Sequence, residues 1–277
     1  FVWAGQDAGL GREVGAQWRD ALNDALAPPH ARFTRVLGAD AVDQRMTVSQ
    51  RGRLSREEAV RIGRKSGAQR VVWGSVGPVS SETHVQLFRD TIARRITQKG
   101  EDGKLSVHWV EVPIEVVARV RDVQVDVDFE VISTLDGTSL AHQHVPQTTR
   151  ARVVWTSFAP EGDVSNYALV SETVRTGNPE RTKDVETRWK SACGEATTLQ
   201  QVLAARRETR GEPGYDRGSL GRFAAGAAFV FLQELPPAQD LALAAVKTGW
   251  QPLLNDLTRL DAVDDVDLGV SATGDER

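Results

Sequence analysis

Three glycines near the start of the chain have the spacing of a phosphate-binding turn. Gly9, Gly11 and Gly15 lie between a possible strand and a helix, where backbone amides and the positive end of the helix can hold a phosphate. The pattern is weak by itself, and Asp40 comes too late after the next strand to bind a ribose. A tight entry into the helix is the favoured interpretation, and nucleotide binding is the alternative.

Two histidines and a row of acids flank a predicted hairpin. His142 and His144 would share one face of a strand, a spacing that suits two imidazoles on one metal ion. Asp126, Asp128 and Glu130 could add oxygen ligands or act as paired catalytic carboxylates. An exposed strand gives no desolvation to separate carboxylate pKa values. A solvated polar face is therefore favoured, and we expect no metal site here.

The loop of that hairpin sets its register. A two-residue loop at Asp136-Gly137 would turn both histidines toward the apolar side of the sheet. A three-residue loop would shift the parity and bring His142 beside Glu130.

The single cysteine, Cys193, excludes an intrachain disulfide and the multi-cysteine zinc patterns. Its surroundings supply no motif that assigns it a general base, so a buried or idle thiol is expected. Ser75 and Ser219 lie in no nucleophile-elbow sequence. We expect no catalytic residue and no cofactor, and therefore no enzyme.

The strongest structural signal is an alternation of apolar and polar residues before Asp136-Gly137. This period of two predicts a half-buried strand that turns into a second one, because Asp-Gly is a hairpin signal. The residues predicted to be buried are Val123, Val125, Val127, Phe129 and Val131, and those predicted to be mostly exposed are Asp122, Asp126, Asp128 and Glu130.

The first part of the chain predicts alternating strands and helices. Apolar residues recur at every fourth position from Leu10 to Leu26, which indicates a helix with one buried stripe. Ser55 and Glu58 form a capping box that starts a second helix, with Gly67 as its end. The predicted strands are Phe1–Ala4, Phe33–Leu37 and Val71–Val76.

A second predicted hairpin, Val85 to Val117, carries a candidate partner surface. Its alternation is irregular and a polar turn lies at Lys99 to Lys104, which favours an arm that extends beyond the core. Arg94 and Arg95 form a basic cluster on it, and Trp109 could serve as an interface anchor. These three are the predicted partner-binding residues.

The remaining segments are mostly helical in prediction. The segment 160–213 is expected to be a loop carrying one helix at Arg188–Arg207. Two further helices are expected at Leu220–Leu235 and Leu241–Leu260, followed by a frayed acidic tail after Ala262.

Composition is that of a globular protein with 277 residues, 40% hydrophobic residues and a net charge of -4. This charge gives no general attraction to nucleic acid. The longest apolar run, Phe223–Leu232, is too short to span a bilayer. The chain starts at Phe1 without a signal-like stretch, and its only methionine is the internal Met46, so we infer a processed or trimmed chain and leave the presence of a targeting signal open.

Several short motifs occur together in the first part of the chain: Gly9-Leu10-Gly11, the run from Ala59 to Ala68, the strand Val71 to Val76 and the turn at Asp136-Gly137. They resemble those of a bacterial envelope family, that of the curli-secretion lipoprotein and the TolB amino-terminal domain. The resemblance covers about residues 1–158, with Gln69 where the family often has Asp and Asp136 where it often has Thr. It implies a periplasmic or outer-membrane-associated interaction domain without an active site.

These observations together predict an α/β (α+β) fold, with a mixed sheet and long antiparallel hairpins packed against helices. We expect an α/β domain at 1–158, an insertion at 159–217 and C-terminal helices at 218–277. The expected function is non-enzymatic: a protein-binding or assembly module of the bacterial cell envelope, with roles in secretion or envelope assembly. Its partners would be other envelope proteins or itself, with neither nucleic acid nor a membrane-spanning segment. A nucleotide-dependent enzyme using the loop Gly5 to Gly11 is the alternative.

Overall fold

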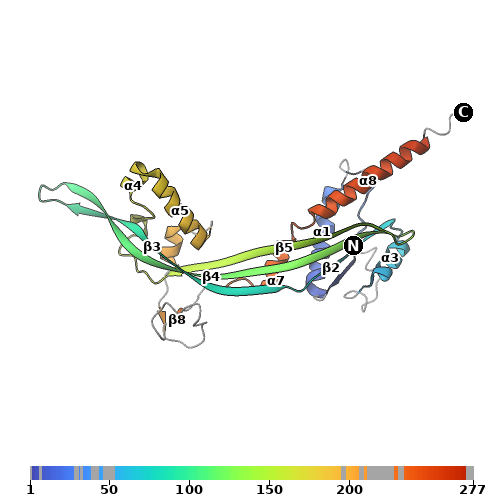
Figure 1. Ribbon diagram of the computed structural model, residues 1–277, viewed down its shortest axis with the longest axis horizontal. Helices are drawn as coiled ribbons and strands as arrows, with labels where there is room; N and C mark the ends of the chain where they lie inside the picture. The colour runs from blue at the N-terminus through green and yellow to red at the C-terminus, as the bar shows by residue number, and fades with distance from the viewer. Residues whose placement is uncertain are drawn as a thin grey trace. The chain divides into compact units, whose positions relative to one another are not determined.

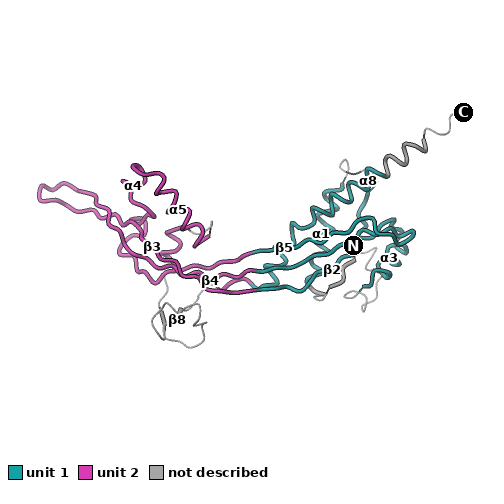
Figure 2. Tube along the Cα trace, viewed as in Figure 1, with its two compact units in different colours: residues 1–81, 123–149, 237–277 teal, residues 82–122, 150–236 magenta. Residues whose placement is uncertain are grey.

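The computed structural model describes residues 2–5, 8–27, 31, 34–38, 44–45, 54–194, 198–205, 209–210, 228–229 and 234–272. The chain forms two compact units (Figure 2): unit 1 comprises 1–81, 123–149 and 237–277, and unit 2 comprises 82–122 and 150–236. The expected three consecutive segments do not coincide with these units, because three long strands each contribute residues to both.

A mixed sheet with long antiparallel hairpins forms the framework, which confirms the predicted fold class. Its strand order is β1-β2-β4-β3-β6, and β5 also pairs with β4. Strand β1 runs parallel to β2, whereas β2 runs antiparallel to β4. The strands are β1 (Val2–Gly5), β2 (Arg70–Val76), β3 (Ser80–Lys99), β4 (Leu105–Ser133), β5 (Ser139–Thr156) and β6 (Tyr167–Ala168) (Figure 1).

One face of β4 supplies the main core of unit 1. All five residues predicted to be buried, from Val123 to Val131, lie in a cluster with helices α1 (Ala8–Ala25), α7 (Ala238–Val246) and α8 (Gln251–Ala272). The stripe of α1 predicted from Leu10 to Leu26 is buried there as well. Its Trp18 indole donates a hydrogen bond of 2.8 Å to the Val246 carbonyl, which fixes α1 on α7. The alternating apolar residues of β4 and the apolar stripe of α1 are therefore buried in the same core.

The opposite face of this part of the sheet is covered by α3 (Arg56–Lys65). The predicted capping box at Ser55 and Glu58 is present at its start, and Gly67 adopts φ 75 just beyond its end. Helix α3 packs Ala59, Val60 and Ile62 against Val71 and Ile132. A Cβ at Gly63 would lie only 3.2 Å from that of Val71, so glycine allows this close approach.

Glu130 is buried, which contradicts its predicted exposure. Only 9% of the residue is accessible, because Arg56 at the start of α3 binds its carboxylate with two hydrogen bonds of 2.9 Å. The hydrogen bonds from Arg56 lower the pKa of Glu130, against the opposing effect of burial. Arg56 also donates to the carbonyl of Gly137 at 2.9 Å, so one guanidinium fixes the strand and the following turn together.

The β4–β5 turn is longer than two residues, so the two-residue register is wrong. Strand β4 ends at Ser133 and β5 begins at Ser139. The Thr134 amide donates to the Gln69 carbonyl at 2.9 Å instead of continuing the hairpin. The predicted Asp-Gly turn is present, with Gly137 at φ 78. The histidines consequently share the acidic face, which is the parity expected for a three-residue loop.

Unit 2 contains the other halves of β3 and β4, the end of β5 and a helical insertion. The insertion forms α4 (Glu172–Gly177), α5 (Pro179–Cys193) and α6 (Leu199–Ala204). Its core joins Ile92 and Ile114 of the hairpin to Val185 and Trp189 of α5. The structure also has a short hairpin of β7 (Thr209–Arg210) and β8 (Ala228–Phe229).

The single helix predicted at Arg188–Arg207 is wrong. Helix α5 begins earlier because Asn178 caps it through the Arg181 amide and Pro179 occupies its first turn. It ends at Cys193, because the next residue, Gly194, has a φ of 87 that does not continue a helix. A separate capping box at Thr198 then starts α6.

Four further predictions need correction. Residues 34–37 have no strand conformation, and Phe33 lies outside the described residues. Residues 228–229 are a strand instead of part of a helix at Leu220–Leu235, most of which is outside the described residues. The helix predicted at Leu241–Leu260 is divided into α7 and α8, and α8 continues to Ala272 where a frayed tail was expected.

Replacing Glu130 by Gln tests the clamp between Arg56 and β4. We expect E130Q to lose about 1.5–3 kcal/mol of unfolding free energy near pH 7, because a charged hydrogen-bond partner is removed. The lowered pKa of Glu130 means that its contribution is complete above the ordinary glutamate pKa and disappears as the pH falls through the lowered value. Denaturant unfolding at several pH values measures both effects.

The matched control is the same substitution at the exposed strand residue Glu82, which we expect to change stability by less than about 0.5 kcal/mol. Equal stability of E130Q and the wild type at pH 7, or a difference that grows on acidification, would contradict the clamp.

Candidate functional site

The glycine-rich entry of α1 lies against β2 where the structure describes it. A Cβ at Gly11 would lie 4.0 Å from the Val76 side chain, which is an ordinary contact distance, so packing does not require a glycine at this position. Gln6 and Asp7, in the middle of the predicted phosphate-binding loop, lie outside the described residues.

The predicted row of acids and histidines forms ion pairs on the sheet surface. His144 Nδ1 lies 2.8 Å from Asp128, and its Nε2 lies 4.0 Å from Asp126. The hydrogen bond with Asp128 raises the pKa of His144. The charge of nearby His142 is the smallest of the causes that lower the pKa of Glu130. Among the described residues, no three His, Cys, Asp or Glu side chains come together as a metal site.

Cys193 is buried at the end of α5, with 2% of the residue accessible. Burial raises the pKa of its thiol to about 11, so the thiolate is scarce at neutral pH and the thiol is a poor nucleophile. Ser75 lies within β2, and Ser219 is outside the described residues.

The predicted partner-binding residues lie together on the β3–β4 hairpin of unit 2, but two of them have internal contacts. Arg94 pairs with Glu161 and lies 5.9 Å above the ring of Tyr167. Arg95 donates a hydrogen bond of 3.2 Å to Asn166. Arg94 thus holds the segment before β6 against β3, a contact between distant segments that basic composition alone did not predict.

A constant register relates Arg95 to Trp109. Arg89 pairs with Glu115, and the Gly100 amide donates to the Lys104 carbonyl at the turn. These two pairs belong to one uninterrupted antiparallel register, and it places Arg95 opposite Trp109. The predicted turn is present between them, with Gly103 at φ 78.

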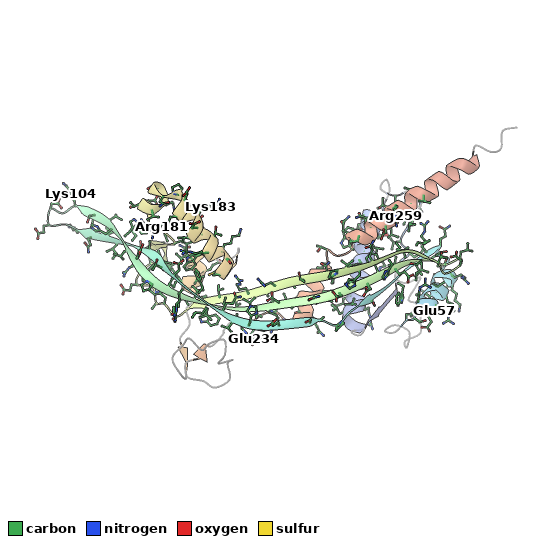
Figure 3. All side chains as sticks on the ribbon, viewed as in Figure 1. Glu57, Lys104, Arg181, Lys183, Glu234 and Arg259 are labelled. Carbon is green, nitrogen blue, oxygen red and sulfur yellow. The ribbon has the colours of Figure 1, made fainter. Side chains whose placement is uncertain are left out.

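The end of this hairpin is a two-stranded ribbon, which we define as Arg95–Lys99 with Leu105–Glu111. Figures 2 and 3 show it continuing past α4 and α5 to Lys104 at its tip. Leu105 is 72% exposed and Val107 is 55% exposed, while Trp109 is partly buried. An apolar row therefore follows one strand outside any core cluster. Sequence analysis found Trp109 but missed Leu105 and Val107, which the alternation around them could have indicated.

A cavity of about 490 Å³ lies where the ribbon meets α4 and α5. Trp109, Val110 and Glu111 line it from the ribbon side. Its charged groups are largely paired within the chain: Arg188 lies 3.2 Å from Asp90, and Arg181 lies 3.5 Å from Glu111. Positive and negative side chains in the lining therefore neutralise one another, and the cavity does not have the charge of a binding site for a small ion. We treat it as part of the surface of the ribbon.

Comparison with models of known protein families and with curated protein sequences found no match. No described helix is both long and apolar enough to cross a membrane.

The pKa of Cys193 predicts a thiol that reacts slowly in the folded chain. A pKa of about 11 instead of the ordinary 9.0 lowers the thiolate fraction at pH 8 by about 100-fold. We expect labelling by iodoacetamide to be slow in buffer and fast in guanidinium. A cysteine introduced at exposed Ser191 in a C193A background is the control. Equal rates for Cys193 and this control in the native state would refute the buried thiol.

Proposed function

We propose that the chain is a non-enzymatic protein-binding module and that the ribbon is its contact surface. The observation that carries the proposal is the exposed apolar row of Leu105 and Val107, continued by Trp109. Exposed apolar groups in a contiguous row indicate an interaction surface, and tryptophan is among the commonest interface anchors. Arg95 opposite Trp109 adds a cation that can bind acidic groups at the rim.

The bacterial envelope is the proposed location, with the periplasm or the outer-membrane surface as the compartment. Its support is the motif resemblance across Gly9–Gly11, Ala59–Ala68 and Val71–Val76. In this proposal the partners are other envelope proteins or further copies of the chain, and the role is envelope assembly or secretion.

A nucleotide-dependent enzyme using the loop Gly5 to Gly11 is the second candidate, and the spacing of Gly9, Gly11 and Gly15 at the start of a helix is its support. Its signature would be a melting temperature that rises with NAD, NADP, ATP or FAD concentration, since ligand bound to the native state stabilises it by mass action.

The double variant R95A/W109A tests the ribbon as contact surface. We expect it to lose most partner capture or self-association, because the anchor and its neighbouring cation are both removed. The melting temperature should fall by less than about 4 °C, since Arg95 is exposed and Trp109 lies outside the core clusters. Affinity capture from envelope extracts, sedimentation and thermal melts provide the measurements.

The control E82A/Q86A changes two exposed β3 residues outside the ribbon and should leave association intact. If R95A/W109A unfolds at a much lower temperature while association persists, the ribbon is part of the core and the proposal fails.

A further inference from the structure

The outer edge of β4 lacks a neighbouring strand along the ribbon. The neighbours of β4 are β2, β3 and β5. Strand β5 ends at Thr156, whose hydroxyl donates to the Glu115 carbonyl. From Leu105 to Ile114, no strand in the described part of the chain therefore pairs with the side of β4 opposite β3.

The register identifies which backbone groups point toward this open edge. In an antiparallel pair, the N–H and C=O of one residue point to the same side, and alternate residues point to opposite sides. The Lys104 carbonyl points to β3, whereas the Glu115 carbonyl points to β5. The residues with outward N–H and C=O groups are consequently Leu105, Val107, Trp109 and Glu111.

The two edges of the ribbon differ in their protection. On the β3 edge, β6 pairs with Ala93 and Arg94, and the outward residues beyond it are Arg95, Thr97 and Lys99. Long cations on an edge strand oppose the addition of another strand. The β4 edge has no lysine, arginine or carboxylate from Leu105 to Val110. It is the edge open to strand addition.

Pro113 limits how far a strand can be added. Its position is also an outward one, and proline has no N–H to donate. The turn at Gly103 bounds the segment at its other end. Leu105–Glu111 is therefore a complete hydrogen-bonding unit, symmetric in position about His108.

We propose that this edge pairs with the same edge of a second copy of the chain, antiparallel and with a two-fold axis at His108. This inference rests on the proposed binding role of the ribbon and names its partner. In this register Leu105 lies opposite Glu111 and Val107 opposite Trp109 of the second copy, so every outward N–H finds a carbonyl. Val107 and Trp109 form cross-strand pairs of the β-branched and aromatic type.

Charge favours the same arrangement. Glu111 of one copy lies at the end of the second ribbon that carries Lys99 and Lys104, and 68% of the Glu111 side chain is accessible. No carboxylate faces a carboxylate along Leu105–Glu111, and His108 is the only residue opposite itself. Pairing along Leu105–Glu111 alone buries less surface than the about 1,200–2,000 Å² of stable protein–protein interfaces. The dimer is therefore weak, and its population depends on protein concentration.

Cysteine substitution on the ribbon tests the partner and the register together. His108 and Ser106 are both exposed, two positions apart on one face. In the proposed dimer the two copies of residue 108 form a non-hydrogen-bonded pair with Cα atoms about 4.5 Å apart, within disulfide range. Residue 106 lies opposite residue 110, too far from its own copy. Cys193 is buried and contributes little background.

We expect H108C to form a disulfide-linked dimer at least about tenfold faster than S106C under mild oxidation. For the wild type, we expect sedimentation to detect the dimer at protein concentrations of about 100 µM. V107P, which removes an outward N–H, should abolish this dimer. V107A, which keeps the N–H, should weaken it less.

Equal cross-linking of S106C and H108C, a dimer unaffected by V107P, or a wild type that stays monomeric would each overturn the proposal. If the chain is monomeric but R95A/W109A still loses capture of another protein, the pairing proposal fails while the binding function stands.

Discussion

The hydrogen-bonding requirement of β4 governs this structure. A strand of 29 residues presents backbone groups on both edges, and each group needs a partner or water. Strands β2 and β3 follow one edge in succession, with the Gly77 amide bonded to the Asp126 carbonyl between them. On the other edge β5 ends opposite the Glu115 region. The ribbon lies beyond the end of β5, where this edge of β4 has no described neighbouring strand. The candidate site is therefore a consequence of the different lengths of β4 and β5.

The polar face of β4 shows a second constraint, the need to pair charge as burial increases. Where α3 covers the sheet, Glu130 is held by the Arg56 guanidinium. Where no described helix covers it, Asp128 pairs with His144 and remains partly exposed. A carboxylate in the same strand pattern is therefore buried and held by a guanidinium at position 130 and paired at the solvated surface at position 128. Coverage by a helix, and not the alternation itself, makes the difference.

The sequence predicts elements whose signal is local. The apolar stripe from Leu10 to Leu26, the capping box at Ser55 and the alternation from Val123 to Val131 each lie within one element, and the structure contains all three. The burial of Glu130 was mispredicted because its partner Arg56 is distant in sequence and belongs to another element. The start of α5 had a local signal in Asn178-Pro179 that outweighs the weak periodicity after Arg188.

The candidate site is less predictable, because an open edge is defined by where other strands end. Trp109 was identified from its residue type, and Pro113 marks an edge position in retrospect. Neither residue shows that β5 stops at Thr156 or that Arg94 is held by Glu161. Such facts follow only from the pairing of segments far apart in the sequence.

Amide hydrogen exchange resolved by residue tests the open β4 edge most directly. In dilute protein, the amides of Val107, Trp109 and Glu111 should exchange rapidly, and those of Ser106, His108 and Val110 slowly, because only the latter point to β3. Raising the protein concentration should slow exchange at the outward amides alone. Equal protection of the two sets in dilute protein would show that the edge is already paired and would contradict the account.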